Sequence, residues 1–229
     1  MLQQRMGGDI MVNMNGFFRH FYTFGYWLAK MMILNICWIA FTLLGLGLFG
    51  IAPASLALTN IVHKWFAEGT EVPILKEFWS AYKKNFVKAN GLFFVWILIS
   101  LFLYMDYFIS KNYIQSFYFH IILMLLIAIS IASFAHFLIV FVRYELPFFH
   151  YFKQALLIAL ARPMETIAMF VSLIILYYLY SFLPVLTAFV GVSLTLYPIL
   201  WFSYRACVSV EENKEKVEQK SKTPSFGKS

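Results

Sequence analysis

The sequence predicts an all-α integral membrane protein with about six transmembrane helices arranged as three hairpins. Of its 229 residues, 62% are hydrophobic and 13% are charged, against roughly 45–50% and 25% in an average soluble domain. Residues 31–62 contain no Asp, Glu, Lys or Arg, and roughly 20 apolar residues are enough to cross a bilayer. Because unpaired backbone groups in hydrocarbon cost several kcal/mol each, unbroken apolar runs of this length indicate helices.

The stretch 31–62 is long enough for two crossings and predicts a hairpin that turns near Gly50. Glycines and Pro53 cluster in its middle, which is typical of a turn. The returning helix is expected to run from about Ala52 to His63 or Phe66, with Pro53 in its first turn, where the missing N–H costs nothing. An amide in hydrocarbon needs a partner, so Asn35 should hydrogen-bond to another helix. The candidate residues that hold this hairpin are Asn35, Trp38, Gly50 and Pro53.

Three stretches outside the apolar runs predict amphipathic, interfacial helices on the cytoplasmic side. Apolar side chains recur at steps of three and four in residues 10–28, so the cytoplasmic N-terminal segment 1–29 should contain a helix that lies on the membrane or packs under the bundle. Residues 68–90 combine an aromatic side with flanking lysines, which indicates a support on anionic lipid or a docking surface for another protein. Residues 143–163 form a second connector of the same kind.

The remaining apolar runs supply four further crossings. We expect them at about 91–108, 119–142, 164–183 and 185–204, which completes a six-helix transmembrane domain over residues 30–208. Lys30, at the start of the first crossing, should extend its alkyl stem toward the headgroups. The chain beyond this domain is rich in Lys, Glu, Gln and Ser, so residues 209–229 are expected to form a disordered cytoplasmic tail.

The sequence shows no motif for catalysis or for a cofactor. Its five histidines are scattered, none of them paired at the i, i+4 spacing of a helical zinc site, and no Gly-rich phosphate loop is present. Cys37 and Cys207 suggest no disulfide framework. A short apolar core followed by a cleavage site is also missing, so no cleaved signal peptide is expected. These observations favour a non-enzymatic protein without a cofactor.

Four short motifs occur together in this chain. They are NICW at residues 35–38, GIAPA at 50–54, FWSAYKKNF at 78–86 and ALARP at 159–163. Together they resemble the YesL-like family of bacterial integral membrane proteins, a domain of unknown function common in Gram-positive bacteria. Members are often encoded beside genes for carbohydrate uptake, including ABC sugar transporters. The resemblance therefore implies a place in the bacterial cytoplasmic membrane and a role in glycan uptake or its control.

Two functions fit these observations. The first is a non-enzymatic accessory or regulatory protein of carbohydrate uptake or sensing, which docks ABC sugar transporter subunits or a membrane sensor kinase through its basic cytoplasmic surface. Its candidate contact residues are Lys83, Lys84, Asn85, Lys88 and Arg162. The alternative is a small permease or channel for a sugar or related solute, since tyrosine combines an apolar ring with a hydrogen-bonding hydroxyl. Its candidate pathway residues are Asn35, His136, Tyr177, Tyr178 and Tyr180.

The distribution of basic residues predicts that both termini lie in the cytoplasm. If the first crossing runs outward, nearly every Lys and Arg falls on inside segments, and Lys111 is the one that falls outside. Membrane proteins concentrate Lys and Arg in their cytoplasmic segments. The same bias explains the formal net charge of +7 more simply than nucleic-acid binding does.

A reporter enzyme that is active only outside the cytoplasm tests this orientation. Fused after Lys111 it should be active, because this loop is expected to leave the cytoplasm. The same reporter fused to the C-terminus is the matched control and should be inactive. Activity that appears in the opposite pattern would overturn the predicted orientation.

Overall fold

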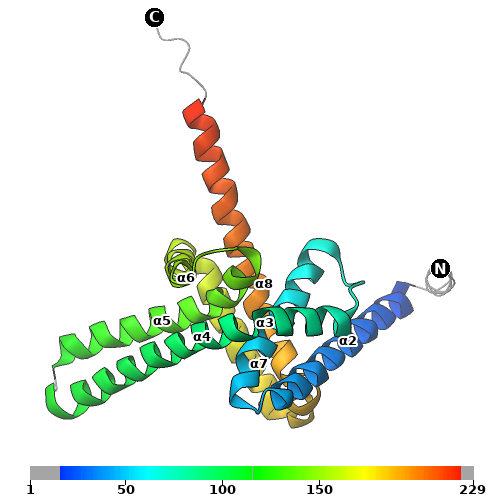
Figure 1. The fold of residues 1–229 in the computed structure, drawn as a ribbon, viewed down its shortest axis with the longest axis horizontal. Helices are drawn as coiled ribbons and strands as arrows, with labels where there is room; N and C mark the ends of the chain where they lie inside the picture. The colour runs from blue at the N-terminus through cyan, green and yellow to red at the C-terminus, as the bar shows by residue number, and fades with distance from the viewer. Residues whose placement is uncertain (1–15, 115, 223–229) are drawn as a thin grey trace, which may run out of the picture.

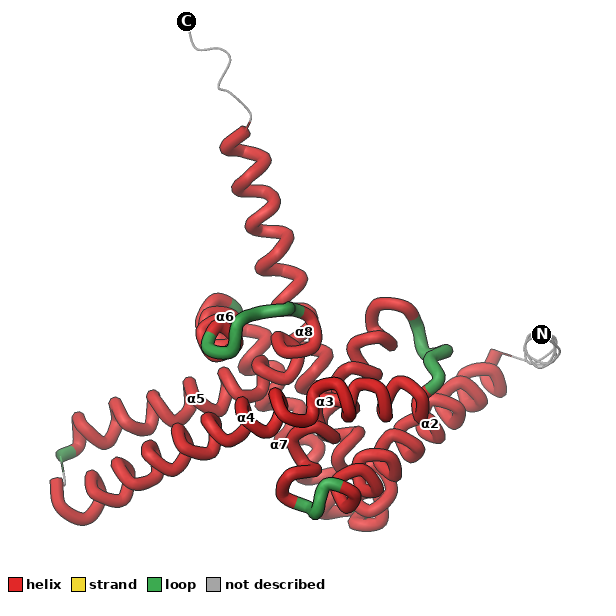
Figure 2. The backbone as a smooth tube through the Cα atoms, viewed as in Figure 1, coloured by secondary structure: helices red, strands yellow, loops and turns green. Residues whose placement is uncertain are grey.

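The computed structural model describes residues 16–114 and 116–222, and its regular elements within these residues are all helices (Figures 1 and 2). This confirms the predicted all-α fold. In chain order the elements are α2 (Gly16–Leu44), α3 (Leu48–Glu68), α4 (Ile74–Ile109), the π-helical turn η1 (Ser110–Ile114), α5 (Phe117–Arg143), α6 (His150–Ala161), α7 (Pro163–Phe182) and α8 (Pro184–Lys222).

Five helices in the described part of the chain are long and apolar enough to cross a membrane, namely α2, α4, α5, α7 and α8. The protein is therefore a multi-pass membrane protein. The sequence predicted about six crossings, and α3 is the expected crossing that is not among these five helices. Its 21 residues span about 31 Å, which is sufficient for the hydrocarbon core. The mean hydropathy of α3 is what sets it apart, since it carries polar residues such as Asn60, His63 and Lys64.

α3 is the innermost helix of the protein. It packs on α2, α4, α5 and α8, and more than half of its residues are buried. Several of these are small, including Ala52, Ala54 and Ala57, and small side chains let helix backbones approach closely. Because α3 faces other helices on most sides, it can be less apolar than a helix that faces lipid.

The turn between α2 and α3 lies at Gly45–Gly47, a few residues before the predicted position at Gly50. Leu46 and Gly47 have positive φ angles of 57° and 75°, which a glycine adopts without cost and a leucine does not. Gly50 has a different role. A Cβ atom built on it would stand 2.2 Å from the carbonyl oxygen of Thr42, so its glycine permits the close approach of the two helices.

α3 also begins a few residues earlier than the expected start near Ala52. Because α3 begins at Leu48, Pro53 is its sixth residue and lies inside the helix instead of in its first turn. The ring of Pro53 is buried among the neighbouring helices. Its missing N–H leaves the carbonyl of Phe49 without the usual helical donor.

Two helix breaks that the sequence suggested are absent. Separate interfacial helices were expected in residues 10–28 and 68–90. Residues 16–28 and 74–90 instead continue without a break into the crossings that follow them, as parts of α2 and α4. Residues 69–73 form the loop before α4, and residues 10–15 lie outside the described residues. A glycine in a helix costs only about 1 kcal/mol. Gly91 does not end α4, which packs there against the ring of Phe148. With 36 residues α4 is about 54 Å long, longer than a bilayer core of roughly 30 Å.

α6, in the second connector, is the one of these expected interfacial helices that remains separate from the helix that follows it, among the described residues. Arg162 ends it with φ −131° and ψ 66°, and Pro163 then begins α7. Proline disfavours a helical conformation in the residue before it and is well suited to the first position of a helix. The helix of the second connector therefore ends before the next crossing, whereas the helix of the first connector continues into α4.

The disordered tail expected from residue 209 is not observed over residues 209–222, which continue α8 as a regular helix; residues 223–229 lie outside the described residues. The prediction of disorder rested on composition, which does not show that this segment contacts another helix. Glu211 accepts two hydrogen bonds from the guanidinium of Arg143, at 2.9 and 2.6 Å. This pair fixes the base of the extension, whose far end projects beyond the other helices (Figure 1).

The distal halves of α4 and α5 form a long hairpin that extends away from the other helices (Figure 1). Its large apolar side chains are exposed on both helices; Phe94, Phe102 and Leu125 are 59%, 66% and 60% exposed. A soluble protein rarely exposes so much contiguous apolar surface. This surface is suited to contact with lipid.

Gly50→Ala tests the close contact between α2 and α3. The added methyl group would overlap the backbone of Thr42, so the hairpin has to open. We expect a loss of about 1–3 kcal/mol in stability, the usual cost of overpacking, seen as a lower melting temperature of the detergent-solubilised protein. Gly25→Ala is the matched control, because nothing lies within 4 Å of a Cβ atom at that position. Equal melting temperatures for Gly50→Ala and Gly25→Ala would contradict the argument.

Candidate functional site

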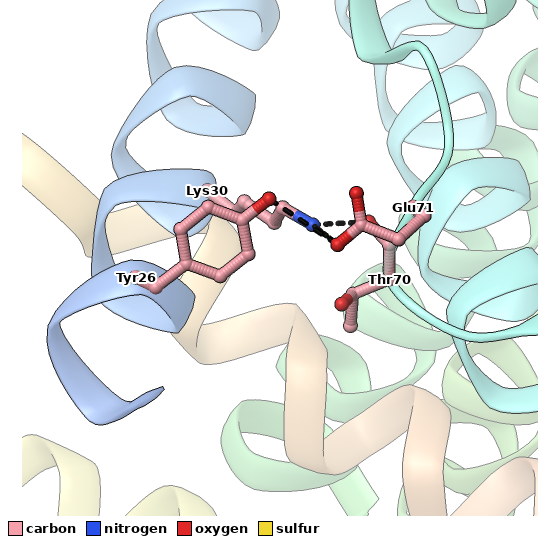
Figure 3. Close-up of polar contacts among 4 residues, drawn as sticks. All are labelled: Tyr26, Lys30, Thr70 and Glu71. Atoms are coloured by element: carbon pink, nitrogen blue, oxygen red, sulfur yellow. Dashed lines mark hydrogen bonds and ion pairs between the residues drawn. The ribbon is translucent and has the colours of Figure 1, made fainter. Parts of the chain in front are cut away.

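The loop between α3 and α4 is fixed to α2 by Lys30, which Figure 3 shows with its partners. Lys30 is buried, and protein groups hold its ammonium group. Its Nζ donates to the carbonyl oxygen of Thr70 and lies 3.2 Å from Oε1 of Glu71. The same Nζ stands 4.3 Å from the ring centroid of Tyr26, whose hydroxyl donates to Glu71. These contacts hold the chain just before α4 begins.

A polar cavity of about 520 Å³ lies beside the first half of α4. Its walls come from α3, α4, the end of α5, the connector that follows α5, and α6. Most lining residues are polar, and three of them are lysines. The lining consists of Asn60, Lys64, Glu77, Ser80, Ala81, Lys84, Asn85, Lys88, Phe141, Val142, Tyr144, Glu145, Leu146 and Tyr151.

The charged groups of this cavity are not all paired. Lys64 and Glu77 form an ion pair of 2.6 Å between α3 and α4. Lys88 donates to the hydroxyl of Tyr151 at 2.9 Å and stands over its ring. Lys84 takes part in none of the ion pairs found among the described residues, and its side chain is exposed at the cavity. The lining therefore retains an uncompensated positive charge.

Tyr151 holds the far wall of the cavity in place. It is buried, and its ring packs on Phe141 with centroids 5.2 Å apart. Its hydroxyl accepts a hydrogen bond from the backbone N–H of Leu146 at 3.1 Å and donates to the carbonyl of Tyr144 at 3.2 Å. Together with the contact to Lys88, one side chain of α6 thus joins α4 to the connector after α5.

The side chain of Tyr144 connects the cavity wall to α8. Its hydroxyl donates to Glu211 at 2.5 Å, beside the ion pair between Glu211 and Arg143. Burial raises the pKa of the Tyr144 phenol, and the hydrogen bond to the carboxylate raises it further. Tyr144 therefore keeps its proton at neutral pH and acts as a hydrogen-bond donor.

The structure brings together three of the five residues predicted to contact a partner. Lys84, Asn85 and Lys88 line the cavity. Lys83 is exposed but does not belong to the lining, and Arg162 donates to the carbonyl of Ser209 on α8 at 2.9 Å. Sequence reasoning missed the lining residues Lys64, Glu77, Tyr144 and Tyr151. Glu77 lies on α4 but the other three come from α3, the connector after α5 and α6, and no motif joins the four.

Comparison with known proteins places the chain in a family. The family described as "Protein of unknown function, DUF624" matches residues 31–107. The uncharacterized protein YteU of Bacillus subtilis (strain 168) is 33% identical over 201 residues, which cover 85% of this chain and 88% of YteU. The chain belongs to the DUF624 family.

Two further relatives of this DUF624 protein come from the same organism and are also uncharacterized. YesV is 34% identical over 186 residues, which cover 80% of this chain and 89% of YesV. YesL is 26% identical over 205 residues, which cover 86% and 92%. These relatives confirm the resemblance to YesL-like proteins. No solved structure matches the chain significantly.

The DUF624 match includes the four residues predicted to hold the first hairpin. Asn35 is buried, and its amide donates to the carbonyl of Ala188 and accepts from the N–H of Val192, each at 3.1 Å. A regular helix pairs these two groups with each other, so Asn35 bridges one backbone bond of α8 and fastens α2 to it. Trp38 donates to the hydroxyl of Ser55 on α3 at 3.1 Å.

The five predicted pathway residues of this DUF624 protein do not meet in one place. Tyr180 bonds to Gly191 and Thr195 of α8. His136 contacts Thr166, which lies 14 residues before Tyr180 on α7 and so about 21 Å from it along the helix axis. Tyr177 and Tyr178 are each 68% exposed on α7. In the described residues, no group of three or more His, Cys, Asp or Glu could hold a metal ion.

Tyr151→Phe tests the wall of the cavity. Without the hydroxyl, the N–H of Leu146 and the carbonyl of Tyr144 lose their partner. Leaving such groups unsatisfied costs about 1–3 kcal/mol, so the melting temperature of the purified protein should fall. Tyr178→Phe removes the same atom from an exposed ring and is the matched control. A melting temperature of Tyr151→Phe equal to that of Tyr178→Phe would show that the hydroxyl does not hold the wall.

Proposed function

We propose that this protein is a non-enzymatic accessory protein of carbohydrate uptake in the bacterial cytoplasmic membrane. In this proposal it docks a partner on its cytoplasmic side, either subunits of an ABC-type sugar transporter or a membrane sensor kinase. The link to carbohydrate uptake comes from the genes that often lie beside members of the YesL-like family. The names of the relatives carry no function, so the docking surface itself has to be argued from the structure.

The outer face of the first half of α4 carries the proposal. Lys76 and Lys83 are exposed there and belong to none of the three ion pairs of the described residues, which use Lys30, Lys64 and Arg143. Trp79 lies between them in sequence and is 51% exposed. Unpaired cations beside an exposed aromatic ring favour an acidic partner, because aromatic residues are enriched in the cores of interfaces and opposite charges guide association.

We infer the orientation from the same lysines. If α3 is the sixth crossing, covered by its neighbours and therefore less apolar, the basic half of α4 and both termini lie in the cytoplasm. The charged extension of α8 then lies on the same side as Lys76 and Lys83. This arrangement satisfies the preference of Lys and Arg for cytoplasmic segments.

A docking role instead of a permease is supported by how the polar side chains of the apolar helices are used. Asn35 of α2 and Tyr180 of α7 bond to backbone groups of α8, and Ser193 of α8 bonds to a backbone carbonyl of α2. Such contacts are the usual means by which polar residues join helices in lipid. A permease would need several of these groups to be available to a solute.

Reversal of charge on the outer face of α4 tests the proposal. A tagged copy is purified from its native membrane in mild detergent, and co-purified proteins are identified by mass spectrometry. Subunits of a carbohydrate ABC transporter or a sensor kinase should accompany the unchanged protein and be lost, at least fivefold, in the double variant Lys76→Glu, Lys83→Glu.

Lys111→Glu is the matched control, because it changes charge at the opposite end of α4. It should retain the partner, and all variants should be present in the membrane at equal amounts. Recovery of the protein alone, or equal recovery of partners with both variants, would overturn the docking role.

A further inference from the structure

We propose that the polar cavity beside α4 is a binding site for a phosphate group carried by a small organic molecule, either a soluble phosphate ester or the headgroup of an anionic phospholipid. This site is separate from the outer face of α4. The proposal does not depend on a protein partner, so either proposal can fail without the other.

The size and lining of the cavity fit a ligand larger than a free ion. Small-molecule sites usually measure about 300–1,000 Å³, and this cavity measures about 520 Å³. One part of its wall is polar, and another is formed by the apolar side chains of Phe141, Val142 and Leu146. A molecule with an anionic end and a less polar end would contact both parts.

The cations of the lining come from two helices. Lys64 reaches the cavity from α3, and Lys84 and Lys88 reach it from α4, one turn apart. Two carboxylates also line it; Glu77 is paired with Lys64, and Glu145 lies on the exposed connector. Three positive charges against two negative ones leave the lining positive, and Lys84 has no ion-pair partner among the described residues.

The lysines of the lining are suited to a phosphate group. Lysine binds phosphate as a point charge, through an ammonium group with three donors. Arg143 and Arg162 are already engaged, with Glu211 and with the carbonyl of Ser209. A phosphate group has oxygens in several directions, so it can accept hydrogen bonds from donors on α3 and α4 together.

Neutral donors complete the lining. Asn60 lies on α3, and Ser80 stands on α4 one turn before Lys84. Both line the cavity, and neither makes a side-chain hydrogen bond to another described residue, so both remain able to bind a ligand oxygen. Their short side chains also leave the space that an ester group would occupy.

Lys84→Gln tests the proposal, with Lys83→Gln as the matched control. The two lysines are adjacent in the sequence and both exposed, but only Lys84 belongs to the lining. Binding of glycerol 3-phosphate to the full-length protein in neutral detergent is measured by calorimetry. Retention of phosphatidylglycerol against phosphatidylcholine, from nanodiscs that contain equal amounts of both, is measured by native mass spectrometry. Unchanged melting temperatures show that both variants are folded.

Two results support the site and distinguish the source of the phosphate. Saturable binding of glycerol 3-phosphate that weakens at least tenfold in Lys84→Gln and less than twofold in Lys83→Gln indicates a soluble ester. Selective retention of phosphatidylglycerol with the same dependence on Lys84, without saturable binding of glycerol 3-phosphate, indicates a lipid headgroup. Binding of neither probe, or equal losses in the two variants, would overturn the proposal.

Discussion

The close contact of α3 with its neighbours is the constraint on which the rest of the structure depends. In lipid, helices gain little from burying apolar surface against one another, so packing and hydrogen bonds have to hold them together. Small residues of α3, such as Ala54 and Ala57, and the glycines at the α2–α3 turn allow that packing. Asn35 adds a bridge from α2 to α8. The central helix is thereby enclosed without being strongly apolar itself.

The position of the polar cavity follows from this enclosure. α3 contributes Asn60 and Lys64 from its C-terminal half, and α4 starts beside it after a short loop held by Lys30. Because α4 is continuous, its basic half is fixed relative to its membrane-spanning half. The lysines of α4 are therefore presented by a rigid helix, and their direction is set by packing deeper in the protein.

The sequence predicted the fold class and the first hairpin because those depend on composition and local pattern. It misplaced the turn, since glycines stand at 45, 47 and 50 and the local pattern does not show which of them turns the chain. The structure gives Gly47 the positive φ and places Gly50 against the backbone of Thr42. It predicted a disordered tail because composition carries no information about the contact between Arg143 and Glu211, 68 residues apart. It predicted no cavity, although three of its candidate partner-contact residues, Lys84, Asn85 and Lys88, line one. Much of the remaining lining comes from α3, α5, the connector after α5 and α6 through tertiary packing, which no local pattern records.

The extension of α8 and the polar cavity are parts of one hydrogen-bonded network. Glu211 binds Arg143 at the end of α5 and Tyr144 on the cavity wall, and the carbonyl of Tyr144 accepts from Tyr151. Tyr151 in turn accepts from Lys88. A chain of partners thus runs from a charged helix outside the apolar core to a lysine of the cavity. Since each group in this chain is satisfied by the next, a change in the direction of α8 would have to move the wall against which Lys88 is held.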